Sequence, residues 1–134
     1  MDIAPVDRFD LRFEPRRWQF ADDNRSAIDA RFAAKQSANP ALWNGRVLLA
    51  RNPVFAGDRL SASYFETDFA SFLAWRDWGF PDPGVFNGFG MGALRCADGA
   101  FVLGEMGQHT SNAGTVPPNY GLNSFVFLGG WRFR

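Results

Sequence analysis

Phe69-Ala-Ser-Phe-Leu-Ala-Trp-Arg-Asp-Trp78 predicts a helix whose aromatic side chains belong to the core. A capping residue, Thr67 or Asp68, precedes this run, and Gly79 and Pro81 follow it as helix-ending residues. An aromatic stripe at helical spacing is more often core packing than a ligand platform. We therefore interpret the tryptophans of this segment as structural.

The segments around this helix predict an α+β fold. Ile28 and Phe32 form a narrow apolar stripe on a second helix, and alternating residues indicate strands. The expected elements are, in order, a strand at 16–20, a helix from Asp22 or Asp23 to Asn39, strands at 47–49 and 59–64 joined by a hairpin loop at 53–58, a strand over 85–95, a turn at 97–99, a returning strand at 101–103 and one more strand at 124–128.

A glycine-rich run within 84–92 invites comparison with phosphate-binding loops. It lacks the Gly-Lys-Ser/Thr ending of a nucleotide P-loop, and Phe86, Phe89 and Met91 alternate with the glycines as in a strand. Glycine at alternate strand positions leaves one face without side chains. We therefore predict close packing of backbone or a helix against this strand rather than a phosphate site.

Composition predicts one soluble globular domain of 134 residues, 46% of them apolar. The formal net charge is zero, which argues against nucleic-acid binding, and no apolar run approaches the roughly 20 residues that span a membrane. Cys96 is the only cysteine, and together with the absence of a signal-peptide pattern it indicates the reducing cytoplasm. We interpret Cys96 as structural, and the alternating charges over 7–17 as a solvated face.

Several word-like segments occur together in the first 116 residues. They are Leu42-Trp-Asn-Gly-Arg-Val47, Phe69 to Asp82, Ala93 to Met106, and His109-Thr-Ser-Asn-Ala-Gly114. In this order they resemble the N-terminal part of a bacterial group within the Nudix hydrolases, over roughly 18–116. The resemblance implies an α/β/α sandwich with a mixed sheet and two main helices, a bound Mg²⁺, and hydrolysis of a nucleoside diphosphate linked to another group.

The glutamate motif that defines this family is absent. Gly99 and Glu105 have its first spacing, but Ala113 and Gly114 stand where its Arg-Glu pair should begin. No carboxylate follows Glu105, whereas a magnesium site needs clustered oxygen ligands. We therefore assign no catalytic residue and no metal ligand. We expect an incomplete Nudix-like domain over 1–116 and a divergent tail over 117–134, and we hypothesise that this tail is out of frame or otherwise truncated relative to a complete hydrolase.

His109 is the only histidine and lies among Thr110, Ser111 and Asn112, residues typical of a polar turn. The resemblance places this segment just before the catalytic helix of the family. It thereby implies a substrate-binding role for His109 and Asn112, against the alternative of a structural turn.

Three functional readings remain open from the sequence. The first is a Nudix-hydrolase-like protein that is truncated and inactive. The second is a noncatalytic module that binds a nucleotide or a protein, and the third is an unstable fragment without a function of its own. A small nucleotide-type substrate is the expected partner, and a homodimer could restore apolar burial if part of the fold is missing.

Overall fold

The chain is described by a computed structural model over residues 5–94, 96–100, 105, 107 and 124–131. Helices and strands are both present, which confirms the α+β class. The described elements are β1 (Arg8–Phe13), α1 (Gln19–Asp23), α2 (Arg25–Ala38), β2 (Arg46–Ala56), β3 (Arg59–Asp68), α3 (Phe69–Asp77), β4 (Val85–Leu94) and β5 (Ser124–Trp131).

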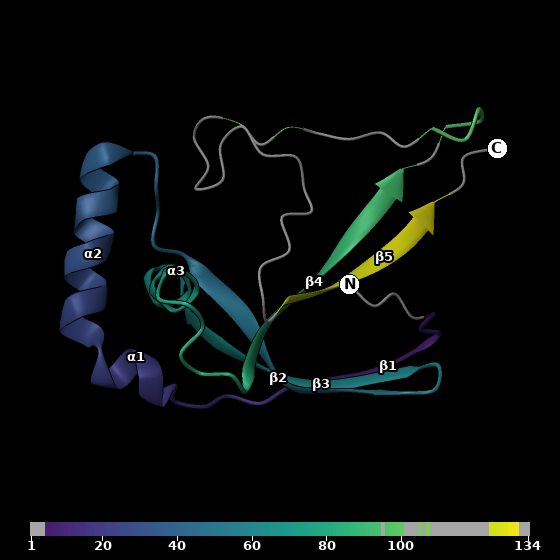
Figure 1. Ribbon diagram of the computed structural model, residues 1–134, viewed down its shortest axis with the longest axis horizontal. Helices are drawn as coiled ribbons and strands as arrows, with labels where there is room; N and C mark the ends of the chain where they lie inside the picture. The colour runs from purple at the N-terminus through teal and green to yellow at the C-terminus, as the bar shows by residue number, and fades with distance from the viewer. Residues whose placement is uncertain (1–4, 95, 101–104, 106, 108–123, 132–134) are drawn as a thin grey trace.

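The sheet is open and mixed, as predicted. Its strand order is β1-β3-β2-β4-β5, and β1 is parallel to β3 while β2 is antiparallel to both β3 and β4. β5 runs parallel to β4 (Figure 1). β2 and β4 are joined only where Ala50 pairs with Phe86 and Arg51 pairs with Val85. The sheet therefore has a narrow junction between its β1-β3-β2 part and its β4-β5 part.

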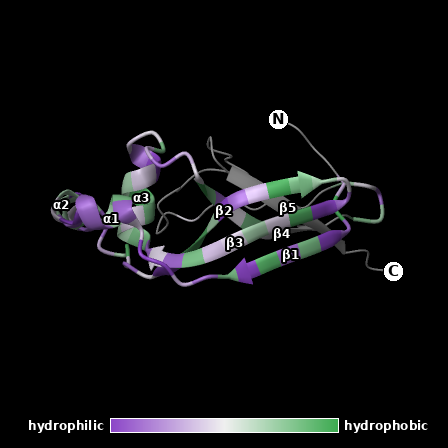
Figure 2. Cartoon of the chain, turned by 90° about the horizontal axis from the view of Figure 1, so that it is seen from below, coloured by the Kyte–Doolittle hydropathy of each residue, from purple (hydrophilic) through white to green (hydrophobic). Residues whose placement is uncertain are grey.

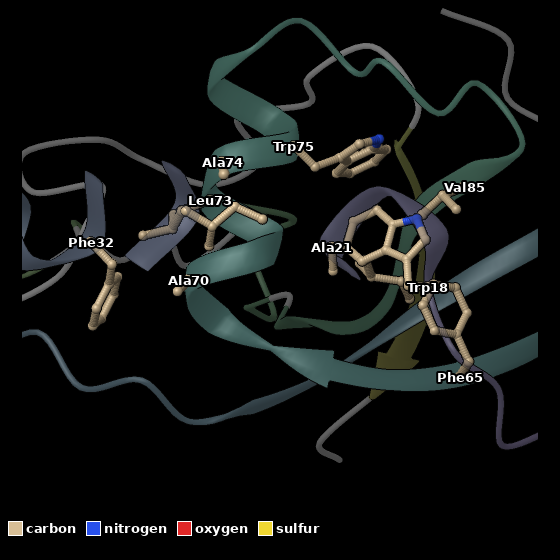
Figure 3. Close-up of a cluster of buried hydrophobic side chains, with 11 residues drawn as sticks. Trp18, Ala21, Phe32, Phe65, Ala70, Leu73, Ala74, Trp75 and Val85 are labelled. Atoms are coloured by element: carbon tan, nitrogen blue, oxygen red, sulfur yellow. The ribbon is translucent and has the colours of Figure 1, made fainter. Parts of the chain in front are cut away.

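The helices gather at one end of the sheet, where α3 packs on the sheet and α2 packs on α3 (Figure 1). Figure 3 shows the indole of Trp18 between Trp75 and Phe65, with ring centroids 6.1 and 5.6 Å away. Aromatic edge contacts of this kind add to the burial of the rings. The core of this end is formed by Trp18, Ala21, Ile28, Phe32, Leu49, Phe65, Ala70, Leu73, Ala74, Trp75 and Val85.

The hairpin between β2 and β3 is tighter than the sequence predicted. β2 continues through Pro53 to Ala56, which pairs directly with Arg59, so the connection is only Gly57 and Asp58. Gly57 has φ 59°, the positive value required at the first position of a type II′ turn. The predicted loop over 53–58 is therefore wrong in its first four residues, because a bulge lets Pro53 sit inside a strand.

The predicted strand at 16–20 is also wrong. Trp18 precedes α1, and its buried ring points into the core rather than to one face of a sheet. The helix expected from Asp22 or Asp23 begins instead at Arg25, after the break at Asn24, and it ends at Asn39 as predicted. Asn24 donates from its side chain to the carbonyl of Phe20 at 2.8 Å, which fixes that break.

The later elements agree with the prediction where they are described. The strand expected over 85–95 is β4, and the strand expected at 124–128 extends to Trp131 as β5. A turn at Asp98 and Gly99 is closed by Cys96 N–H donating to the carbonyl of Ala100 at 2.8 Å. The returning strand expected at 101–103 lies outside the described residues. In the described part of the chain, no helix combines the length and apolar character needed to cross a membrane.

Candidate functional site

The two substrate-binding residues expected from the resemblance, His109 and Asn112, lie outside the described residues. Cys96 is a free, exposed thiol at the start of the 96–100 turn. Gly99 lies in that turn with φ 92°, and Glu105 is exposed. Gly99 and Glu105 therefore begin no helix that the described residues contain.

The three glutamates of the chain all belong to the described part, and they lie in three different segments of the chain. Glu66 on β3 forms an ion pair with Arg46 at 3.1 Å, while Glu14 and Glu105 are exposed in other segments. Across the described ranges, no group of three or more His, Cys, Asp or Glu side chains is arranged to hold a metal ion. The described residues therefore do not fit the Mg²⁺ that the resemblance implies, and no chemical step can be derived through it.

Asp82 accepts hydrogen bonds through both its carboxylate and its backbone carbonyl. Its Oδ2 accepts a hydrogen bond from Trp18 Nε1 at 3.0 Å, and its Oδ1 accepts one from Gly84 N–H at 3.1 Å. Its backbone carbonyl accepts from Trp75 Nε1 at 3.2 Å and from Val85 N–H at 3.3 Å. Two indoles from different helical segments thus converge on one residue and fix the chain between α3 and β4.

Arg51 lies beside Asp82 at the narrow junction of β2 and β4. Its Nη1 is 3.7 Å from Asp82 Oδ2, beyond ordinary hydrogen-bond length. Its buried Nε has no hydrogen-bond partner. A Cβ at Gly84 would lie 3.3 Å from Arg51 Nη2, so glycine there leaves space for the guanidinium. Arg51 is therefore a cation with donor capacity that its neighbours do not use.

The backbone around Arg51 is irregular. The β2–β3 register shifts between Arg51 and Val54, and Asn52 has φ 48°. Asparagine tolerates this left-handed region better than most residues, and bulges often redirect a side chain near a functional site. The bulge therefore determines how the Arg51 side chain leaves β2.

Asp68 organises a second polar network, at the start of α3. Arg25 donates to both of its carboxylate oxygens at 3.2 Å, and Ser71 and Asn44 also donate to it. Burial acts to raise the pKa of Asp68, but these hydrogen bonds outweigh burial and hold the pKa below its usual value. Asp68 occupies the predicted cap position, yet its side chain makes no capping bond to the helix.

The cap of α3 is supplied instead by a distant segment. Asn44 Oδ1 accepts a hydrogen bond from Ala70 N–H at 2.8 Å, and the carbonyl of Gly45 accepts one from Phe69 N–H at 2.8 Å. The loop before β2 thus satisfies two free amides of the first turn.

Asp77 joins α3 to α2 near the other end of α3. It accepts from Arg31 Nη2 at 2.8 Å and forms an ion pair with Lys35 Nζ at 3.1 Å. Burial acts to raise the pKa of Asp77, but the hydrogen bonds from Arg31 and Lys35 and the charge of Arg76 lower it overall. This carboxylate therefore stays ionised and holds the two helices together.

The arrangement favours anion binding over acid-base or metal chemistry. Asp68, Asp77 and Asp82 are already engaged by cationic or N–H donors, whereas Arg51 retains unused donors and is 24% exposed. An arginine fork matches phosphate and carboxylate geometry. We therefore take Arg51, with Asp82 and Gly84 beside it, as the candidate site.

Sequence reasoning missed this site because Trp18 and Asp82 are 64 positions apart and no local pattern joins them. One signal was available beside Arg51. Asn52 and Pro53 are residues that interrupt a strand, and together they indicate a bulge or turn.

Comparison with known proteins finds no match of the chain to a family model, to a curated protein or to a solved structure.

Proposed function

We propose that this chain is a Nudix-hydrolase-like protein that, as it stands, does not hydrolyse nucleoside diphosphate derivatives. The observation that carries the proposal is that two segments which bear the resemblance, 42–47 and 69–82, pack into one unit. Asn44 and Gly45 cap α3 through Ala70 and Phe69. Asp82 at the far end of the same segment accepts from Trp18.

This packing supports the proposed relationship to the Nudix hydrolases because the residues that carry the resemblance contact one another in the fold. The resemblance depends on short segments that are separated in the sequence, and side chains of these segments meet around α3. The mixed sheet under α3 is compatible with the proposed α/β/α sandwich.

The lack of hydrolysis follows from the carboxylates. Phosphoryl chemistry of this family needs several glutamates around magnesium, and the described residues contain no such group. Asp68, Asp77 and Asp82 are held by arginine, lysine or indole donors and would have to lose these partners to bind a cation.

The direct test is an assay of the purified full chain with MgCl₂ and a panel of nucleoside diphosphate sugars and alcohols. Released nucleoside monophosphate is measured through a phosphatase-coupled phosphate assay, with an active Nudix hydrolase as positive control. We expect no release above a mock purification. Turnover that requires Mg²⁺ and is abolished by a chelator would contradict the proposed inactivity.

The proposed ancestry has its own test in the gene. Sequencing from the codon of Gly114 onward and translating all three frames should reveal an Arg-Glu and Glu-Glu cluster in another frame. If all frames lack the cluster, the tail is genuine and the noncatalytic reading is favoured.

Arg51 favours a second candidate function, noncatalytic binding of a nucleotide-type anion. Titration of ADP into the full chain, followed by calorimetry, should give saturable binding that Arg51→Gln weakens at least about tenfold, because a charged hydrogen bond is lost. Arg51→Lys should weaken it less, since the charge remains but the fork does not. Arg46→Gln is the matched control, because Arg46 is exposed and pairs with Glu66. An equal loss of ADP affinity in Arg51→Gln and Arg46→Gln would contradict the proposed anion site at Arg51.

A further inference from the structure

β1 is an edge strand with two chemically distinct faces. It ends the strand order of the sheet and pairs with β3 along its whole length (Figure 1). Figure 2 shows hydrophilic and hydrophobic residues alternating along it. Phe9, Leu11 and Phe13 share one face and are 52%, 43% and 59% exposed. Edge strands with apolar faces are templates for pairing with another chain.

The backbone of β1 has hydrogen-bonding groups directed away from β3. Arg8 N–H donates to the carbonyl of Asp58, and Glu14 N–H donates to the carbonyl of Tyr64. In a parallel pair, alternate residues direct both backbone groups to the same neighbour. Leu11 and Phe13, at the intervening positions, therefore direct their N–H and C=O groups toward the outer edge.

We propose that β1 pairs antiparallel with β1 of a second copy of this chain, about a two-fold axis at Leu11. The charge pattern of the strand is complementary in this register. Arg8 then lies opposite Glu14 of the second copy, and Asp10 lies opposite Arg12 of the second copy, each pair occurring twice. All four side chains belong to the face opposite the apolar one.

The neighbouring registers are disfavoured by the same charges. An axis at Asp10 places Asp10 opposite its own copy and Arg8 opposite Arg12. An axis at Arg12 places Arg12 opposite its own copy and Asp10 opposite Glu14. Like charges directly opposite one another destabilise a strand pair, so the axis at Leu11 is favoured over these two registers.

The apolar face is matched in the same register. Phe9 lies opposite Phe13 of the second copy, and Leu11 lies opposite its own copy, so the exposed rings and the leucines form one continuous surface. Aromatic cross-strand pairs stabilise a sheet beyond backbone pairing. A two-fold contact uses each edge once and closes. The predicted assembly is therefore a dimer and not a fibre.

The first measurement is the mass of the wild-type chain by light scattering across a dilution series. We expect a dimer that dissociates on dilution. A monomer at the highest soluble concentration, or an open series of larger species, would overturn the proposal.

Cysteine cross-linking tests the register in a Cys96→Ser background. Leu11→Cys should form a disulfide-linked dimer on oxidation, because residues opposite one another in a hydrogen-bonded pair have Cα atoms roughly 5.5 Å apart. Phe9→Cys alone should not, since the two copies of position 9 would be roughly 13 Å apart at ~3.4 Å per residue. A mixture of Phe9→Cys and Phe13→Cys chains should cross-link. Efficient cross-linking of Phe9→Cys alone would contradict the axis at Leu11.

Charge-reversal variants distinguish the specific β1–β1 contact from nonspecific association. Glu14 forms no ion pair with a described residue, so Glu14→Arg breaks no such pair and places two arginines opposite each other at both ends of the contact. We expect the dissociation constant to rise roughly threefold to tenfold. Adding Arg8→Glu should restore it, although this change also replaces the exposed Arg8–Asp58 ion pair with two neighbouring carboxylates. Failure of the second change to restore dimerisation, in a chain with wild-type circular dichroism, would refute the charge register.

Discussion

Asn44 caps a helix that begins 25 residues later in the chain, because its side-chain oxygen accepts the backbone N–H of Ala70 at 2.8 Å. Its amide nitrogen donates to Asp68 Oδ2 at 3.2 Å. One side chain therefore joins the loop before β2 to both the cap residue and the first turn of α3.

Asn44→Ala should lower the free energy of unfolding by about 1–2 kcal/mol, since a helix amide and a carboxylate lose a partner. Asn44→Asp keeps the acceptor for Ala70 but replaces the donor to Asp68 with a second negative charge, so we expect a comparable loss. Urea unfolding followed by circular dichroism measures both. Ser26→Ala, at an exposed position of α2, is the control and should change stability by less than about 0.5 kcal/mol. An unchanged free energy of unfolding in Asn44→Ala would show that the Asn44 cap does not stabilise the fold.

The ionised state of Asp77 predicts loss of stability in acid. Its folded pKa is lowered, so the unfolded chain binds the proton more readily, and stability rises with pH across the interval between the two pKa values. The contribution is complete above the unfolded value of about 3.9 and is lost as the pH falls through the lower folded value. Asp68 acts in the same direction.

Asp77→Asn should therefore destabilise the chain near neutral pH and flatten its stability profile below about pH 4. Thermal melts from pH 7 downward measure this difference. Asp23→Asn, at an exposed aspartate with no ion pair among the described residues, is the control variant. Parallel profiles for wild type and Asp77→Asn would mean that the Arg31 and Lys35 contacts contribute nothing.

Trp18→Phe should cost about 1–3 kcal/mol because it removes the indole N–H from Asp82 while keeping an aromatic ring in the core. Trp43→Phe is the matched control, since Trp43 is 78% exposed whereas Trp18 is 4% exposed. Chemical denaturation should separate the two variants by at least about 1 kcal/mol. Indistinguishable midpoints would rule out a stabilising role for the Trp18–Asp82 bond.

Asn52→Gly should leave stability within about 0.5 kcal/mol of the wild type, because glycine accepts φ 48° without steric cost. Asn52→Val should destabilise by about 1–3 kcal/mol, since a β-branched side chain is strained in that region. The same denaturation experiment compares them. If the valine variant were as stable as the glycine variant, the bulge would not impose this conformation on the folded chain.

Local patterns predicted those elements whose signals lie within one segment. The end of α2 at Asn39 follows from the residues at that boundary, and α3 starts and stops close to its expected bounds. The 98–99 turn also agrees. The prediction of local structure failed where a contact between distant segments determines it. The expected strand at 16–20 leads into α1 instead, and Trp18 there bonds to Asp82. Asp68 is the N-cap residue of α3 as predicted, but the capping hydrogen bond comes from Asn44.

The charged residues over 7–17 show the same division. The sequence indicated a solvated mixed-charge face, and Asp10 and Arg12 do lie on an outward face of β1. Their pairing with β3 could not be read from the sequence, because strand neighbours are chosen by contacts about 50 residues away. The edge position of β1 therefore emerged only from the fold.

By itself, the sequence determined where α3, most of α2 and most strands form, and it excluded a clustered-glutamate motif, since both depend on residue type and short spacing. Only the tertiary structure decided which carboxylates are engaged, that Arg51 keeps an unused donor beside Asp82, and that β1 is an edge. Hydrogen bonds and strand pairs between distant segments form when the chain closes on its core, and their partners leave no periodic trace in the sequence.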